Sequence, residues 1–257
     1  MKTIWLSSLL SSEEKVKNLI AQLRTYGLEV KGHFWEDDLG KMSWAKPREE
    51  LIKPDVALWL ILASEEKLQV PSLRYGLSLL AMTVQAGRGA SFPVVVLLDQ
   101  GNLPSSENLP TVLRAAELFL LTDPGLPAKL VARVHTPAGI ITPEYRLDVY
   151  GMPQIGQWFE VGPVEKPWPG ALFGVSGGEI DFHAVGPKGS LPEQSVIEYP
   201  LKGLKLSVGE REYGGWAVQN QLDSGTSYFV RVKGLPESIL FGPYSTQEEA
   251  EFYVVRL

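Results

Sequence analysis

Cysteine is absent from this 257-residue chain, and histidine occurs only three times. The absence of cysteine excludes disulfides, thiolate metal ligands and cysteine nucleophiles, and it fits a protein of the reducing cytoplasm. His33, His135 and His183 are far apart in sequence, and none has the HxxxH or HExxH spacing of a zinc site. We therefore expect no metal site, and we expect a cytoplasmic location.

Long apolar runs and clusters of basic residues are also missing. The longest apolar stretches, such as residues 56–63 and 94–98, are far shorter than the roughly 20 residues that cross a bilayer. No run of lysine or arginine offers the basic patch that binds duplex nucleic acid. The net charge is −6, and its whole excess lies in residues 137–257, with 9 Lys and Arg against 15 Asp and Glu. These features predict neither a membrane nor a duplex as partner.

The first half alternates short apolar runs with amphipathic stretches, which is typical of a parallel sheet covered by helices. Ser12 is the expected N-cap of the first helix, which Gly27 closes. Strands are predicted at Thr3–Leu6, Leu28–His33, Val56–Leu62, Val94–Leu98 and Leu118–Leu121, and further helices at Pro47–Ile52, Ser72–Val84, Leu109–Ala116 and Pro127–Val134. This order predicts a flavodoxin-like α/β domain with a five-stranded parallel sheet and flanking helices.

The second half has a different composition, with 17 of the 25 glycines and 11 of the 19 prolines. These residues separate short β-type runs, so we predict a smaller, mostly antiparallel, β-rich domain. Residues 214–234 are the expected hairpin, with Asp223-Ser224-Gly225 as its turn. A short helix capped by Ser245 or Thr246 is expected near the C-terminus. The prolines of "HTPAGIITPEYR" place the boundary between domains 1–136 and 137–257.

Several short motifs of the first half occur in an order that points to a family. They are "IWLSSLLSSEE", "LIAQLRTYGLEV", "FWEDDLGKMSW", "REELIKPDVALWLILAS" and "VPSLRYGL". This series, over roughly residues 3 to 100, resembles a TIR (Toll/interleukin-1 receptor) domain. A weaker similarity links the chain to nucleoside 2-deoxyribosyltransferases, which share the topology. The resemblance implies a flavodoxin-like fold and either partner binding or cleavage of the glycosidic bond of NAD or a nucleoside.

The chain departs from the family where catalytic TIR domains carry a glutamate on the helix after the third strand. A carboxylate there stabilises an oxocarbenium-like transition state or acts as nucleophile. Counting from Ser64 places that position at Gly76, and the deoxyribosyltransferase register places it at Arg74. Neither side chain replaces a carboxylate, since glycine has none and arginine opposes a developing cation.

Two other groups of carboxylates remain as candidates. Glu65 and Glu66 follow the third strand, where doubly wound sheets bind ligands, and they are equally the ordinary acidic residues of a helix N-terminus. Glu36, Asp37 and Asp38 follow the second strand, where they could contact a ribose or cation, or form a charged loop that meets partners.

The remaining candidates are small hydroxyls and two tryptophans. Ser7 and Ser8 could bind a phosphate at the end of the first strand, but neither GxGxxG nor a Walker sequence is present, which favours a turn or cap. Trp35 and Trp44 could stack on a base or sugar, or cover the sheet edge. In the second half, Trp158, Trp168 and Trp216 could line a binding surface or build a core.

We therefore expect a TIR-like protein-interaction or signalling module that lacks the catalytic glutamate. It would bind a protein partner or itself, possess no obligatory cofactor, and have NAD or a nucleotide as a candidate ligand. The alternative is a hydrolase or transferase acting on an N-glycosidic bond with a relocated carboxylate, Glu65 or Glu66. A third interpretation is a structural or carbohydrate-binding role of residues 137–257.

Overall fold

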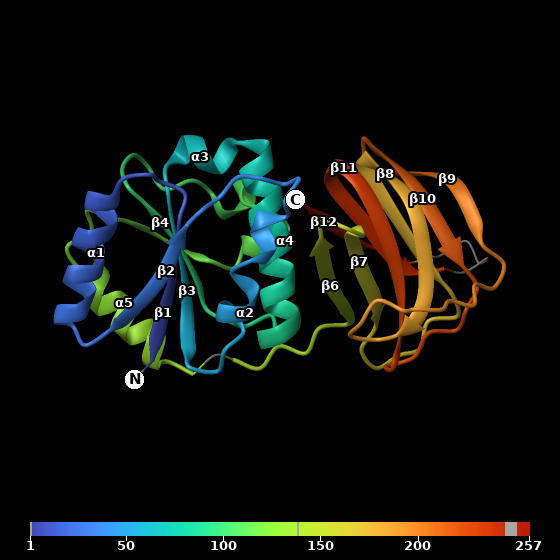
Figure 1. The fold of residues 1–257 in the computed structure, drawn as a ribbon, viewed down its shortest axis with the longest axis horizontal. Coiled ribbons are helices and arrows are strands. Elements are labelled where there is room, and N and C mark those ends of the chain that lie inside the picture. The colour runs from blue at the N-terminus through green and yellow to red at the C-terminus, as the bar shows by residue number, and fades with distance from the viewer. Residues whose placement is uncertain (1, 138, 245–250) are drawn as a thin grey trace. The chain divides into compact units, whose positions relative to one another are not determined.

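The chain folds into two compact units, Met1–Ile141 and Thr142–Leu257. The structure is a computed structural model that describes residues 2–137, 139–244 and 251–257 (Figure 1). No helix in these residues is both long and apolar enough to cross a bilayer. The boundary between the units lies within the proline-containing segment that the sequence marks as the linker.

The first unit is built on a five-stranded sheet in the order β2-β1-β3-β4-β5. All four strand pairs are parallel, and the order is that of flavodoxin-like folds. The strands are β1 (Thr3–Ser8), β2 (Glu29–Phe34), β3 (Val56–Ala63), β4 (Val94–Leu98) and β5 (Glu117–Leu120). The predicted α/β sheet is confirmed because each of its apolar runs forms a strand.

Helices cover both faces of this sheet (Figure 1). Helices α1 (Glu13–Thr25) and α5 (Leu126–His135) lie on one face, where Leu19, Leu23 and Leu130 join a buried cluster with the strands. Helices α2 (Arg48–Leu51) and α4 (Pro71–Arg88) lie on the other face, and the short helix α3 (Glu65–Gln69) follows β3. The predicted cap of the first helix is confirmed, since the Ser12 hydroxyl accepts the Lys15 N–H.

The predicted helix at Leu109–Ala116 is wrong. Only a single 3₁₀ turn, Thr111–Leu113, forms after Pro110, and the N–H of Leu113 donates to the Pro110 carbonyl at 2.9 Å. Bonds between residues three apart continue to Ala116, after which β5 begins at Glu117. The segment is too short, between a proline and a strand, to propagate an α-helix.

The second unit contains a seven-stranded sheet whose main path runs β6-β7-β11-β8-β10-β9, with β12 paired to β11. Every pair is antiparallel, as predicted. The strands are β6 (Tyr145–Met152), β7 (Gly156–Pro163), β8 (Ala171–Pro187), β9 (Leu201–Val208), β10 (Arg211–Val218), β11 (Thr226–Pro243) and β12 (Tyr253–Arg256).

The two long strands of this sheet, β8 and β11, pair along their lengths and shift register between Gly234 and Ser238. Gly177 and Gly234 take positive φ at this irregularity, a conformation that favours glycine. The aromatic side chains of Phe159, Phe173 and Phe241 are fully buried beneath the sheet. Trp158 and Trp168 are also buried, so these two tryptophans belong to the core.

The predicted hairpin between residues 214 and 234 is wrong, because β10 pairs with β8 and β9 while β11 lies between β7 and β8. The turn signal itself is real, since the Asp223 carboxylate accepts the Gly225 N–H at 2.8 Å. The connecting segment instead bridges Leu222 to Trp168. The predicted cap at Ser245 or Thr246 lies outside the described residues.

Candidate functional site

The carboxyl ends of the parallel strands bring most of the candidate residues of the first unit together. Gly76 lies in α4, beneath the loop that follows β2. A Cβ atom built on Gly76 would lie 2.9 Å from Cζ2 of Trp35, 3.5 Å from Cβ of Trp44 and 3.7 Å from Cδ2 of Leu39. The position at which the TIR-like register would place a glutamate is therefore filled by the loop, with no room for a Cβ atom unless Trp35 shifts.

The two tryptophans of this loop, Trp35 and Trp44, both pack against α4. Trp44 is 2% exposed and lies in a 3₁₀ turn, Ser43–Ala45, that packs on α4. Trp35 is partly exposed, and its backbone N–H donates to the carbonyl of Ser8 at 2.8 Å. Its ring lies 6.2 Å from that of His33, between centroids. Trp44 therefore covers the helix, whereas Trp35 both seals Gly76 and remains accessible.

The acidic side chains of the loop are held by neighbouring donors. Asp37 accepts a hydrogen bond from the Ser72 hydroxyl at 2.7 Å, which ties the loop to the start of α4. Hydrogen bonding from Lys46 lowers the pKa of Glu36. Hydrogen bonds from Lys41 likewise lower the pKa of Asp38, whose carboxylate accepts the Lys41 N–H at 2.9 Å. These contacts hold the loop in an ordered conformation.

Ser7 and Ser8 are the last residues of β1, not a turn after it, because pairing with β2 and β3 continues through both residues. Both are buried. The Ser7 hydroxyl accepts the indole N–H of Trp59 at 2.9 Å, and the Ser8 hydroxyl donates to the Leu10 carbonyl at 2.8 Å. Their side chains thus stabilise the strand end, which a strand boundary at Leu6 did not anticipate.

Arg74 also serves the fold. Its guanidinium donates to the carbonyl oxygens of Asn108, at 2.7 Å, and Leu68, at 3.4 Å. Burial lowers its pKa. The residue that the deoxyribosyltransferase register puts at the catalytic position therefore joins α4 to the segments around Leu68 and Asn108.

Glu65 and Glu66 lie exposed in the first turn of α3. Ser64 caps this helix by accepting the Lys67 N–H. This is the ordinary place for acidic residues at a helix N-terminus. A carboxylate in open solvent is a weaker general acid or nucleophile than one in a closed site, because water competes for it and screens its charge.

An open pocket of about 380 Å³ lies at the carboxyl ends of β1 and β2. Its lining includes the backbone that leaves β1, the start of α1, and the side chains of Phe34, Trp35 and Lys67. Phe34 is 45% exposed although it is apolar. An aromatic wall beside an ammonium group suits a planar or anionic ligand. Among the candidate residues predicted from the sequence, Ser8 and Trp35 line this pocket, whereas Arg74 and Trp44 do not.

Sequence reasoning missed one buried carboxylate at the same edge of the sheet. Asp99 directly follows β4, and its side chain is 7% exposed. One carboxylate oxygen forms a salt bridge with Lys15 at 2.8 Å, and the other is buried with no hydrogen-bond partner among the described residues. An aspartate immediately after an apolar strand was the signal that could have identified it.

Several buried polar groups of the second unit are hydrogen-bonded within it. Glu160 accepts hydrogen bonds from Tyr150, Ser227 and the Gly189 N–H. His183 is 5% exposed, and its Nδ1 lies 2.8 Å from the Tyr228 hydroxyl. These networks fix the strands of the sheet to one another.

Comparison with known proteins does not assign the chain to a family. No protein-family model matches it, and no curated protein matches it either. The function is therefore argued from the residues and the geometry described above.

Proposed function

We propose that the first unit is a TIR-like protein-interaction module that works by binding partners and does not cleave glycosidic bonds. The observation that carries this proposal is the packing of Trp35, Trp44 and Leu39 over Gly76. A catalytic frame that had merely lost its glutamate would keep a cavity there. Here the loop occupies that space, and its exposed charged side chains face solvent, where a partner can reach them.

The recognition surface proposed for this module is the loop from residue 35 to residue 44. It combines the exposed residues Glu36, Asp37 and Lys41 with a partly exposed tryptophan. Contacts with Ser72 and Lys46 hold the loop in one conformation, so little conformational entropy is lost on binding. Charged side chains on such a surface make binding selective for a partner of complementary charge, and they increase the rate of association. The occupants proposed are a protein partner or a second copy of the chain.

Replacing the charges of this loop tests the proposal. We expect Asp37→Asn with Asp38→Asn to weaken self-association or partner binding at least fivefold, measured by sedimentation of the full chain or with its captured partner. The amides retain acceptors for Ser72 and Lys41, so the melting temperature will change little. The Asp37→Ala and Asp38→Ala pair will weaken binding equally and also lower the melting temperature, because both acceptors are lost.

The control removes the same amount of charge at the amino ends of the strands, away from the loop. Glu29→Gln with Glu117→Gln alters the first residues of β2 and β5 and should leave association unchanged. An association constant that is the same in the loop variant and the wild type would disprove the recognition role.

A nucleotide is the small ligand proposed for the pocket at β1 and β2. The support is the combination of Phe34, Trp35 and Lys67 around about 380 Å³, at the sheet edge where doubly wound folds bind ligands. No carboxylate aimed at a glycosidic carbon is needed for this binding.

The alternative is an N-glycosidic-bond hydrolase or transferase with a relocated carboxylate. The observation that favours it is Asp99, because its buried oxygen without a partner is a better candidate than the exposed Glu65 and Glu66. The Lys15 ammonium pairs with the other oxygen of the same carboxylate at 2.8 Å.

A further inference from the structure

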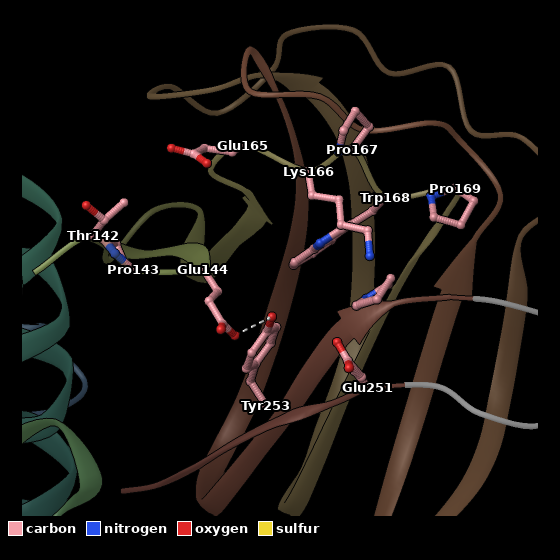
Figure 2. Close-up of a pocket in the computed structure, with 11 residues that line it drawn as sticks. Thr142, Pro143, Glu144, Glu165, Lys166, Pro167, Trp168, Pro169, Glu251 and Tyr253 are labelled. Carbon is pink, nitrogen blue, oxygen red and sulfur yellow. Dashed lines mark hydrogen bonds between the residues drawn. The ribbon is translucent and has the colours of Figure 1, made fainter.

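The second unit contains a groove of about 720 Å³ that the functions above do not use. Four segments line it: the start of β6, the loop from β7 to β8, the end of β11 and the start of β12. Figure 2 shows Glu144 and Tyr253 joined by a hydrogen bond, with Trp168 and its neighbouring prolines also lining the groove. All the residues that line the groove belong to the second unit.

Proline and aromatic residues line the groove beside its charged side chains. Prolines at positions 143, 167, 169 and 243 contribute to the lining. Trp168 is 5% exposed and is held by two backbone hydrogen bonds with Leu222, each of 2.9 Å. Tyr253 packs against Tyr145 and Phe241, with centroid distances of 4.5 and 5.7 Å. A groove held in this way needs little reorganisation to receive a ligand.

The charge of the lining is negative, and part of it acts on an aromatic ring. Three carboxylates line the groove against one ammonium group, that of Lys166. The Tyr253 hydroxyl donates to the Glu144 carboxylate at 3.1 Å. Burial raises the pKa of Tyr253, and the hydrogen bond with Glu144 and the charges of Glu144 and Glu251 raise it further. Negative potential is therefore concentrated around this ring.

We propose that this groove binds an extended, basic segment of a partner protein, with a lysine or arginine side chain beside Tyr253. A cation at this place is attracted by the face of the Tyr253 ring and by the carboxylates of Glu144 and Glu251. Proline and aromatic walls suit an extended chain, which carries no internal hydrogen bonds to break. A second copy of this chain is a poorer occupant, because the net charge of −6 opposes self-docking on an acidic surface.

Calorimetric titration of the full chain with a basic probe tests this proposal. The probe is an acetylated peptide Lys-Pro-Arg-Pro-Lys-Pro, and its counterpart has glutamate at every basic position. We expect saturable binding of the basic peptide only. Glu144→Gln with Glu251→Gln should weaken binding at least tenfold, and Tyr253→Phe less than threefold because the ring remains.

The matched control is Glu210→Gln with Glu212→Gln, which removes one exposed carboxylate from the turn between β9 and β10 and a second from the start of β10. It should change the affinity less than twofold. Equal weakening by the groove pair and the control pair would show that the peptide responds only to total charge, and it would overturn the proposal. So would the absence of saturable binding by the wild type at millimolar peptide. If free spermidine bound and the groove variants weakened its binding, while the peptide did not bind, the protein-partner proposal would be overturned. The ligand of the groove would then be a polyamine.

Discussion

Introducing glutamate at position 76 is expected to destabilise the first unit, not to restore an enzyme. The new side chain would begin 2.9 Å from the ring of Trp35 and would be buried against Trp44 and Leu39. Overpacking of a core costs about 1–3 kcal/mol, and burying a carboxylate without a partner adds several more. We expect Gly76→Glu to lower the free energy of unfolding by at least about 3 kcal/mol, measured by denaturant titration.

Two further variants make this result specific. Ala86→Glu puts the same side chain on an exposed position of α4 and should cost less than about 1 kcal/mol. Trp35→Ala combined with Gly76→Glu should be less destabilised than the sum of the two single variants, because removing the indole opens the space that the glutamate needs. Strict additivity, or a Gly76→Glu variant as stable as the wild type, would mean that the loop does not close this position.

Acidification between pH 6.5 and pH 4 is expected to destabilise both units through one histidine in each. Burial lowers the pKa of His33 to about 4, and burial together with the charge of Lys202 lowers the pKa of His183 to about 4. The Nδ1 atom of His33 accepts the indole N–H of Trp5 at 3.2 Å, which requires that nitrogen to be unprotonated. His183 contacts Tyr228, whose own pKa is raised by burial.

Acid destabilises the protein because the unfolded chain binds a proton on each of these histidines at a higher pH than the folded chain does. An unfolded histidine titrates near 6.5, so the contribution of each neutral, buried histidine is complete above that pH. As the pH falls toward 4, the unfolded chain takes up protons that the folded chain does not, and stability is lost. For His183 the loss by pH 4 is up to about 3 kcal/mol.

Scanning calorimetry between pH 7 and pH 4.5 measures this dependence. The His183→Gln variant should have a lower melting temperature at pH 7 but a smaller decrease on acidification than the wild type. His135→Gln, at an exposed position in α5, is the control and should retain the wild-type decrease. If wild type and His183→Gln lost stability in parallel over this range, His183 would not be the group that titrates.

The sequence was most informative where structure is decided locally. The apolar run Val94–Leu98 forms a strand with the predicted bounds, and Ser12 caps the first helix as expected. Both follow from contacts within a few residues or from burial on both faces of a parallel sheet. The alternation of strands and helices predicted the parallel α/β sheet, because parallel strands need crossover connections between them.

Long-range pairing was the part that the sequence could not determine. The turn at Asp223 was recognised, but nothing local says that β11 pairs with β8 and β7 instead of β10. At the candidate site, the sequence predicted that Gly76 stands where the TIR-like register would place a glutamate. It did not reveal that Trp35 covers this position, because that contact joins a loop and a helix 41 residues apart in the sequence. Asp99 was missed although its place directly after β4 was a local signal, and only its salt bridge with Lys15 of α1 is a long-range contact.

Incubation of the purified full chain with NAD, and separately with a panel of nucleosides, tests most directly whether the first unit is an enzyme. Free nicotinamide or free base is followed by chromatography. A variant with Glu65→Gln and Glu66→Gln, and a second with Asp99→Asn, are run in parallel. We predict that none of the three proteins releases product above a blank without protein. Release by the wild type that disappears in either variant would contradict the proposal and identify the carboxylate that replaces the missing glutamate.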